Sequence, residues 1–210
     1  MVVDAAAGRS VLSDVLEFHT VFFASADAGI VNDFAAGQVA ALHEFDCQLA
    51  PLDSVGSEYD VHLVVARHRL SGEMLGGARI TVPVNTTDRL PLEALLARLR
   101  LLGKAQRLHP VGRVPAELSS LWVDGRYRGC GLGSTLIREA LNLAANANAI
   151  DVVSTVSSPH MMSKCENLGF TLDQRFGHAG RFEYPDPRYQ SAVMHIDCSS
   201  FGGAECPHGQ

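Results

Sequence analysis

The chain has 210 residues, of which 47% are hydrophobic and 19% charged, and its formal net charge at pH 7 is −6. This length predicts one domain, which we place at 1–198, with a small, polar and flexible tail at 199–210. The acidic balance argues against a nucleic-acid partner, and no run of eighteen apolar residues predicts a membrane span.

The first half of the chain alternates strand and helix patterns. "EFHTVFFAS" at 17–25 is apolar, aromatic and β-branched and predicts a strand, and apolar residues at helical spacing predict a helix over 30–45. "VHLVVARH" at 61–68 and "MLGGARITVP" at 74–83 predict two strands joined by "RLSGE". "LPLEALLARLRLLG" at 90–103 predicts a helix that begins near a proline and ends at a glycine.

The second half continues the alternation. "AELSSLWVDG" at 116–125 predicts a strand that stops at Asp-Gly, and a helix is expected over 134–149. A short buried strand at 151–157, a short helix at 159–170 and a last strand at 191–198 follow. Strands and helices mixed in this way predict an α/β (α+β) fold.

Cysteine usage bears on location and on metal binding. The five cysteines are odd in number and show no CxxC spacing, and no N-terminal signal peptide is evident, so we expect a cytoplasmic protein. The histidines and cysteines near the C-terminus fit no zinc pattern, so no metal is expected.

The stretch "RYRGCGLGST" at 126–135 has three glycines at alternate positions just before a predicted helix. Glycines at a helix N-terminus let a phosphate approach unpaired backbone N–H groups at the positive end of the helix dipole. Ser134 stands where a dinucleotide fingerprint needs its third glycine, and the Gly-Lys-Ser/Thr ending of an ATP-binding P-loop is absent. The glycines alone are therefore consistent with a phosphate site or with a plain helix cap.

The wider segment "ELSSLWVDGRYRGCGLGSTLIREAL" closely resembles the acyl-CoA-binding signature of the GCN5-related N-acetyltransferase superfamily. The Arg/Gln-x-x-Gly-x-Gly core of that signature falls on Arg128, Gly131 and Gly133, and "CENLGF" further on resembles the "YEKxGF" segment of the family. The resemblance implies a mixed central sheet that splays at the acyl-CoA site, with helices flanking it, and coenzyme A or acyl-CoA as the donor substrate.

The resemblance also assigns the residues that would bind the donor. Backbone groups at the end of the strand would bind the pantetheine arm as an added strand does, and amides of the glycine loop would bind the pyrophosphate. These residues are Leu121, Trp122, Val123, Arg128, Gly129, Cys130, Gly131, Leu132, Gly133 and Ser134. The side chain of Cys130 is expected to fill space, because the family transfers the acyl group directly.

The acyl transfer needs a general base, which takes a proton from the attacking amine, and a general acid, which gives a proton to the departing thiolate. Glu117 lies in the motif strand, where the superfamily often places its base, and strand alternation predicts that Ser119 and Leu121 share its side of the sheet. A solvent-exposed glutamate at a strand end is the alternative. Cys165 occupies the position of the tyrosine that is usually the acid, and the alternative is an inert buried cysteine.

The N-terminal half shows a second, weaker resemblance, to acyl-homoserine-lactone synthases and N-acyl amino acid synthases. The matching positions are Glu58, Asp60, Arg79 and Glu117, of which the first three would bind the acceptor or be ordinary surface charges. Ser120 stands where those families have an arginine, and "GQVAALHEF" lacks the arginine of their first long helix. These departures argue against a homoserine-lactone product.

The resulting expectation is an N-acyltransferase that moves an acyl group from acyl-CoA, or from an acyl carrier protein, to the amine of a small molecule such as an amino acid. The alternatives are an acetyl-CoA-dependent N-acetyltransferase and a non-catalytic sensor of acyl-CoA. A basic run at 98–113 could dock an acidic carrier protein or be a solvated surface, and a homodimer is left open.

The leucine-rich segment between Pro83 and Ala116 is longer than a plain acetyltransferase needs. We expect it to surround a medium-to-long acyl chain, because each buried methylene contributes about 0.8 kcal/mol. The alternative is that its leucines only pack against the sheet.

Overall fold

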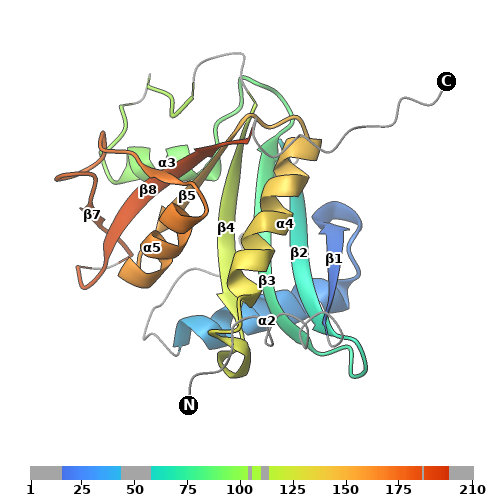
Figure 1. Ribbon diagram of the computed structural model, residues 1–210. Helices are drawn as coiled ribbons and strands as arrows, with labels where there is room; N and C mark the ends of the chain where they lie inside the picture. The colour runs from blue at the N-terminus through green and yellow to red at the C-terminus, as the bar shows by residue number, and fades with distance from the viewer. Residues whose placement is uncertain (1–15, 44–57, 104–105, 110–113, 186, 199–210) are drawn as a thin grey trace.

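The computed structural model describes residues 16–43, 58–103, 106–109, 114–185 and 187–198. One sheet of eight strands runs through this part of the chain in the order β1-β2-β3-β4-β5-β8-β6, and β7 pairs with β8 (Figure 1). The strands are β1 (Leu16–Phe22), β2 (Tyr59–His68), β3 (Met74–Pro83), β4 (Pro115–Val123), β5 (Asp151–Val156), β6 (Thr171–Leu172), β7 (Phe182–Glu183) and β8 (Gln190–Asp197). All adjacent pairs are antiparallel except β4 and β5, which are parallel.

Helices cover both faces of the sheet, so the predicted α/β (α+β) class is confirmed (Figure 1). The helices are α2 (Ala28–His43), α3 (Pro91–Arg98), α4 (Leu132–Asn146) and α5 (Pro159–Asn167), with short 3-10 turns η1 (Phe23–Ser25) and η2 (Gly125–Tyr127). No helix of the described residues is both long and apolar enough to cross a membrane. The predicted tail at 199–210 lies outside the described residues.

The largest hydrophobic cluster lies on the face that α4 and α5 cover. Leu136, Ile137 and Leu141 of α4 are fully buried there, together with Val64 of β2 and Ile80 of β3. Hydrophobic burial of this kind is the main favourable term in folding, and it fixes α4 directly against the central strands.

The opposite face carries α2 and α3. Phe34 of α2 packs against Leu63, Val65 and Trp122, and its ring meets the Trp122 ring edge-on at 6.1 Å. A second cluster joins α3 to β5 and β8, and its buried members are Leu90, Leu92, Leu96, Leu102, Leu108, Val153, Phe176, Phe182 and Val193. Helices therefore cover both faces of the sheet. Its β4–β5 region lies between α4 and α5 on one side and α3 on the other.

The helix predicted over 90–103 is shorter in the structure and ends at Arg98. Arg100 adopts the left-handed conformation with φ 61°, and the N–H of Leu101 donates to the carbonyl of Leu96 at 2.8 Å, as in a Schellman C-cap. The left-handed residue after the helix is therefore an arginine. Gly103, the glycine that we expected to end the helix, lies beyond this C-cap.

Candidate active site

Strands β4 and β5 pair at their beginnings and then part. Three parallel pairs join them, and the last of these is Glu117 with Val153. Beyond that point β4 continues to Val123 along β3, and β5 continues to Val156 along β8, without pairing between the two strands (Figure 1). The facing edges can therefore hydrogen-bond an extended ligand that enters between them.

A β-bulge in β4 lies next to this divergence. Arg79 of β3 pairs with Ser119 and Gly77 pairs with Trp122, so Ser120 and Leu121 lie opposite the single residue Ala78. Ser120 accordingly has a positive φ of 52°. A non-glycine residue in this conformation is strained by on the order of 1–3 kcal/mol and is often found at functional sites.

The bulge corrects our assignment of the faces of β4. Regular alternation predicted Leu121 on the side of Glu117 and Ser119, with Trp122 opposite. In the structure Leu121 and Val123 pack towards the α4 cluster, and Trp122 packs against Phe34 on the other face. The extra residue shifts the alternation by one, and the side-chain pattern alone did not reveal it.

The glycine loop follows β4 and leads directly into α4. Gly129 has φ 81° and Gly131 has φ 96°, values that disfavour any residue with a side chain. A Cβ atom at either position would have no neighbour within 4 Å, so both face open space. Gly131 is the N-cap of α4 and offers no side-chain acceptor to the first-turn amides. The exposed backbone is therefore suited to an anion.

Side chains on the flanks fix the conformation of the loop. Asp124 caps η2 by accepting from the N–H of Arg126 at 2.9 Å, and the Arg126 guanidinium, which also pairs with Glu73, holds the pKa of Asp124 below its usual range. Nε of Arg128 donates to the carbonyl of Val123 at 3.0 Å, so this carbonyl is engaged inside the protein. The Cys130 thiol lies 2.7 Å from the carbonyl of Tyr127.

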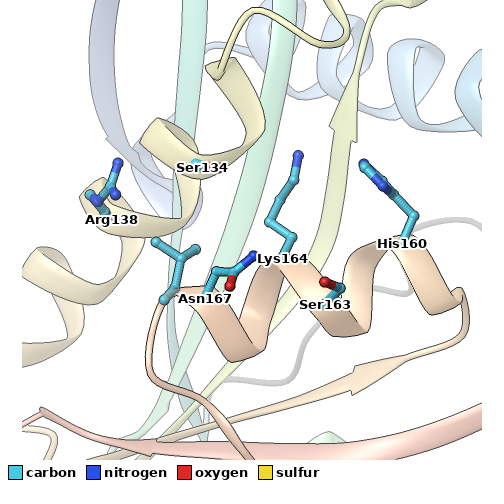
Figure 2. Close-up of a pocket in the computed structure, with 7 residues that line it drawn as sticks. Ser134, Arg138, His160, Ser163, Lys164 and Asn167 are labelled. Atoms are coloured by element: carbon cyan, nitrogen blue, oxygen red, sulfur yellow. The ribbon is translucent and has the colours of Figure 1, made fainter.

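Two residues of the motif contribute to the core rather than to an exposed surface. Leu132 is buried in the main cluster, and Gly133 is buried in the first turn of α4. Their backbone amides, rather than side chains, are the groups that they can offer to a ligand. Ser134 follows at the same helix end, is half-buried, and lines a pocket together with residues of α5 (Figure 2).

Glu117 is buried on the face of the sheet that α3 covers. Its Oε2 atom accepts from the backbone N–H of Leu92, in the first turn of α3, at 2.7 Å. Burial raises the pKa of Glu117, while the hydrogen bond from Leu92 and the charge of Arg79 oppose that rise. The alternative of a solvent-exposed glutamate is wrong, because only 8% of the residue is exposed.

Arg79 and Tyr59 lie on the same face as Glu117. Nε of Arg79 donates to the hydroxyl of Ser119 at 2.9 Å, across the β3–β4 pair. Tyr59 donates to the carbonyl of Arg89, and burial, together with nearby carboxylates that include Glu117, raises its pKa. The sequence offered one signal for Tyr59, its place between two candidate acceptor residues.

Glu58 and Asp60 do not join this group. Both are exposed. Asp60 points to the other face of the sheet, since it lies one residue out of phase with Tyr59 along β2. The structure therefore brings Glu117, Arg79 and Ser119 together but leaves these two carboxylates at the surface.

Cys165 is buried in the main cluster, on the inner side of α5. Burial raises the pKa of its thiol to about 11, so the thiol is protonated at neutral pH. Cys198, the residue directly after β8, is equally buried, and burial also raises its pKa to about 11. Among the described residues there is no group of three or more His, Cys, Asp or Glu that could hold a metal ion.

Comparison with known proteins agrees with this architecture. The family model described as acetyltransferase (GNAT) family matches residues 42–170. The uncharacterized protein Rv1356c of Mycobacterium tuberculosis (strain ATCC 25618 / H37Rv) is 24% identical over 177 residues. That match covers 81% of this chain and 65% of the length of the relative.

Two solved structures share the fold over most of the chain. The acyl-homoserine-lactone (AHL) synthase LasI has a TM-score of 0.62 and 12% identity, with 87% of this chain and 90% of that chain covered. FeeM, an N-acyl amino acid synthase from uncultured soil microbes, has a TM-score of 0.61 and 13% identity, with 87% and 92% covered. Identities this low establish the shared fold and nothing more.

Proposed function

Because this chain belongs to the acetyltransferase (GNAT) family, we propose that it is an N-acyltransferase. It would move an acyl group from acyl-CoA, or from an acyl carrier protein, to the amine of a small molecule such as an amino acid. The observation that carries the proposal is the position of Glu117, a buried carboxyl at the last paired position before β4 and β5 part.

The donor would bind along the diverging strands and the glycine loop. Its pantetheine arm would hydrogen-bond the edge of β4 that β5 leaves unpaired beyond Glu117, at Leu121 and Val123. The engaged carbonyl of Val123 makes the N–H group the more available partner at that residue. Its phosphate groups would meet the amides between Arg128 and Ser134.

The acyl transfer would proceed by direct attack. The neutral amine adds to the thioester carbon while the carboxylate of Glu117, directly or through a water, takes the proton that the nitrogen loses. Collapse of the tetrahedral adduct forms the amide and breaks the C–S bond, and the electron pair leaves with sulfur as a thiolate. A raised pKa suits this role, because a base works best when its pKa is near the working pH.

We propose that Cys165 is only a weak proton donor to that thiolate. Its thiol is protonated at neutral pH, but a pKa of about 11 lies above the ordinary pKa of a thiol. Proton transfer from Cys165 to the leaving sulfur is therefore uphill, and solvent can supply the proton instead.

Arg79 supports an acceptor that carries a carboxylate. Its guanidinium lies on the same face as Glu117, is held by Ser119, and is close enough to oppose the rise in the pKa of Glu117. An amino acid bound with its carboxylate at Arg79 would place its amine on the face where Glu117 lies. Bidentate pairing of this kind is a common role of arginine.

A second candidate donor is acetyl-CoA, and the packing of the segment between β3 and β4 favours it. Leu90, Leu92 and Leu96 of this segment are buried against Val153 and Val193 of the sheet. These leucines are already buried in the folded protein, so they do not need a long acyl chain to cover them.

The test is incubation of the purified full chain with acetyl-, octanoyl- and palmitoyl-CoA and a panel of amino acids. Thiol release and the mass of the N-acyl product are measured. We expect release of CoA that depends on both an acyl donor and an amine. Thermal stabilisation by CoA without thiol release on any amine would instead identify a non-catalytic acyl-CoA sensor.

A further inference from the structure

Glu93 is a buried carboxylate that directly follows Leu92, the residue whose N–H group binds Glu117. Only 1% of Glu93 is exposed. Its Oε2 atom accepts from the N–H of Leu90 at 3.1 Å, and its Oε1 atom accepts from the N–H of Leu108 at 2.7 Å. One carboxylate thereby joins the start of α3 to a residue outside the helix, 15 positions further along the chain.

Arg107 supplies the counter-charge of Glu93. Its Nε atom lies 3.2 Å from Oε1 of Glu93. Its two terminal nitrogens donate to backbone carbonyls of the turn before α3, those of Thr87, at 2.8 Å, and Asp88. One guanidinium therefore binds the buried carboxylate and this turn at the same time. Hydrogen bonds between charged groups are strong, and a buried charge that loses its partner is costly.

These contacts fix the position of the first turn of α3. The N-terminus of a helix leaves backbone N–H groups without partners inside the helix, and the N–H of Leu92 is one of them. Oε2 of Glu117 accepts from that group at 2.7 Å. Within the part of the chain that the structure describes, this is the one hydrogen bond to the Glu117 carboxylate, so its Oε1 atom is left to take a proton.

The charges around Glu117 come from three elements. Arg79 lies on β3 and Glu93 on α3, while Tyr59 of β2 is neutral at pH 7 because its pKa is raised. Burial is the main cause of the raised pKa of Glu117, and the hydrogen bond from Leu92 is the largest of the effects that oppose the rise. The charge of Glu93 adds to the rise. The pKa of Glu117 therefore reports how well the Leu92 hydrogen bond is kept.

We propose that Arg107 and Glu93 are positioning residues for the base. They fix the start of α3, so that the Leu92 N–H group holds one oxygen of Glu117 and leaves the other oxygen to take the proton of the acceptor amine. This role rests on the proposed acyltransfer, in which Glu117 is the base. Both residues act through Leu92 and need no contact with the acceptor.

The test compares the wild type with Arg107→Gln, Arg107→Lys and Glu93→Gln, all in the full chain. Arg107→Lys keeps the charge beside Glu93 but not the planar fork of donors. The matched control is Arg67→Gln on β2. The Arg67 side chain is 23% exposed, against 24% for Arg107, and it also pairs with a carboxylate, that of Asp33 at 3.9 Å.

Three properties are measured for every variant. Carbon-13 NMR of the glutamate carboxyl groups gives the pKa of Glu117, whose signal is identified by its loss in Glu117→Gln. Thiol release gives kcat and KM, with the most reactive acyl-CoA and amino acid of the proposed panel. Urea denaturation gives the free energy of unfolding and shows which variants are folded.

We expect Arg107→Gln to raise the pKa of Glu117, because the opposing hydrogen bond from Leu92 is loosened. It should also lower kcat by roughly 10–100-fold, because a displacement of about 1 Å can cost that much, while the KM for acyl-CoA changes little. The acid limb of the kcat profile should move to higher pH, because a base with a higher pKa stays protonated up to a higher pH.

The other variants separate charge from position. Glu93→Gln should lower kcat similarly but raise the pKa of Glu117 less, because it also removes a like charge. Arg107→Lys should show a smaller rise in that pKa than Arg107→Gln, and it decides the same question where Arg107→Gln fails to fold. Arg67→Gln should keep the wild-type kcat and the wild-type pKa of Glu117.

The outcomes distinguish this role from the proposed function. An unchanged pKa of Glu117 in all three variants at Arg107 and Glu93 would overturn the positioning role, whatever happens to kcat. A raised pKa with wild-type kcat would exclude Glu117 as the base. A wild type without turnover on any amine would overturn the acyltransfer, while the NMR titration would still decide whether Arg107 and Glu93 hold the carboxyl group in place.

Discussion

The carboxylate of Glu117 caps the helix that follows β3, since its Oε2 accepts from the backbone N–H of Leu92 at 2.7 Å. The candidate base is thus also a structural partner of α3. Glu93, one residue further along, is 1% exposed and accepts from the N–H groups of Leu90 at 3.1 Å and Leu108 at 2.7 Å. Two buried carboxylates therefore hold the start of α3, and mutations at Glu117 must separate chemistry from capping.

Glu117→Gln is the substitution that separates them. The glutamine carbonyl can still accept from Leu92, but it cannot take a proton, so turnover should fall roughly 10²–10⁴-fold while CoA affinity is kept. Steady-state rates and calorimetric CoA binding measure the two effects. Glu117→Ala, which removes the cap as well, serves as the comparison that should also lower thermal stability. Wild-type turnover in Glu117→Gln would exclude the glutamate as base.

The raised pKa of Glu117 sets the sign of a pH effect on stability. A carboxyl whose pKa is higher in the folded protein binds its proton more tightly there, so its contribution to stability is complete below the unfolded pKa. That contribution is lost as pH rises through the folded pKa. The free energy of unfolding of the wild type, relative to Glu117→Gln, should therefore decrease between about pH 4 and neutral pH. Urea denaturation at several pH values measures this difference, and a difference that rises with pH would contradict the assignment.

The open loop gives a prediction with a closely matched control. Gly131→Ala places a methyl group where φ is 96° and no atom lies within 4 Å, and Gly72→Ala does the same at φ 70° in the turn between β2 and β3. Both substitutions should be strained by a similar amount, on the order of 1 kcal/mol. Only Gly131→Ala should weaken CoA binding, by about tenfold or more, because its methyl group would occupy the space for the phosphates. Equal CoA affinity in the two variants would remove the loop from the binding site.

Much of the architecture was predictable because local patterns and tertiary packing agree. The apolar periodicity that predicted a helix over 134–149 corresponds to the buried face of α4, and the glycine loop before it lies within residues 42–170, which the family model matches. Glu117 was identified from its place in the motif strand, where the superfamily that the segment resembles often has its base, and the structure places it at the divergence of β4 and β5.

The remaining features depend on contacts that sequence spacing does not encode. The bulge at Ser120 follows from the register of β4 against β3, and the helix end at Arg100 uses a residue type that rarely adopts a left-handed conformation. The pocket that Arg138 and Lys164 line together with Ser134 joins two helices that are separated by β5 in the chain (Figure 2). Neither residue stands out locally, because lone charges on helices are usually solvated.

The two buried cysteines allow a direct test of whether Cys165 gives a proton to the leaving thiolate. Cys165 and Cys198 are each 2% exposed and have pKa values raised to about 11, so alanine should destabilise the protein similarly at both sites. If Cys165 protonates the leaving thiolate, Cys165→Ala should lower kcat by up to about tenfold and Cys165→Tyr should partly restore it. Cys198→Ala should leave kcat unchanged. Equal rates in the two alanine variants would remove Cys165 from the mechanism.

We expect the leucine cluster that joins α3 to β5 and β8 to limit the length of the acyl chain that the site admits. Leu96 is fully buried there, and Leu136 is fully buried in the α4 cluster on the opposite face, so Leu96→Ala and Leu136→Ala form a matched pair. Each should lower the free energy of unfolding by about 2–5 kcal/mol. The cavity left by Leu96→Ala would lie in the cluster that also contains Val153, the partner of Glu117, and should admit about two more methylenes of an acyl chain.

At about 0.8 kcal/mol per methylene, that space should raise the kcat/KM ratio of octanoyl-CoA to acetyl-CoA by roughly tenfold in Leu96→Ala. Leu136→Ala should keep the wild-type ratio despite its similar loss of stability. The ratios are measured by thiol release, with urea denaturation as the stability check. An identical ratio in both variants would mean that the α3 cluster only packs against the sheet, and that the acyl chain extends elsewhere.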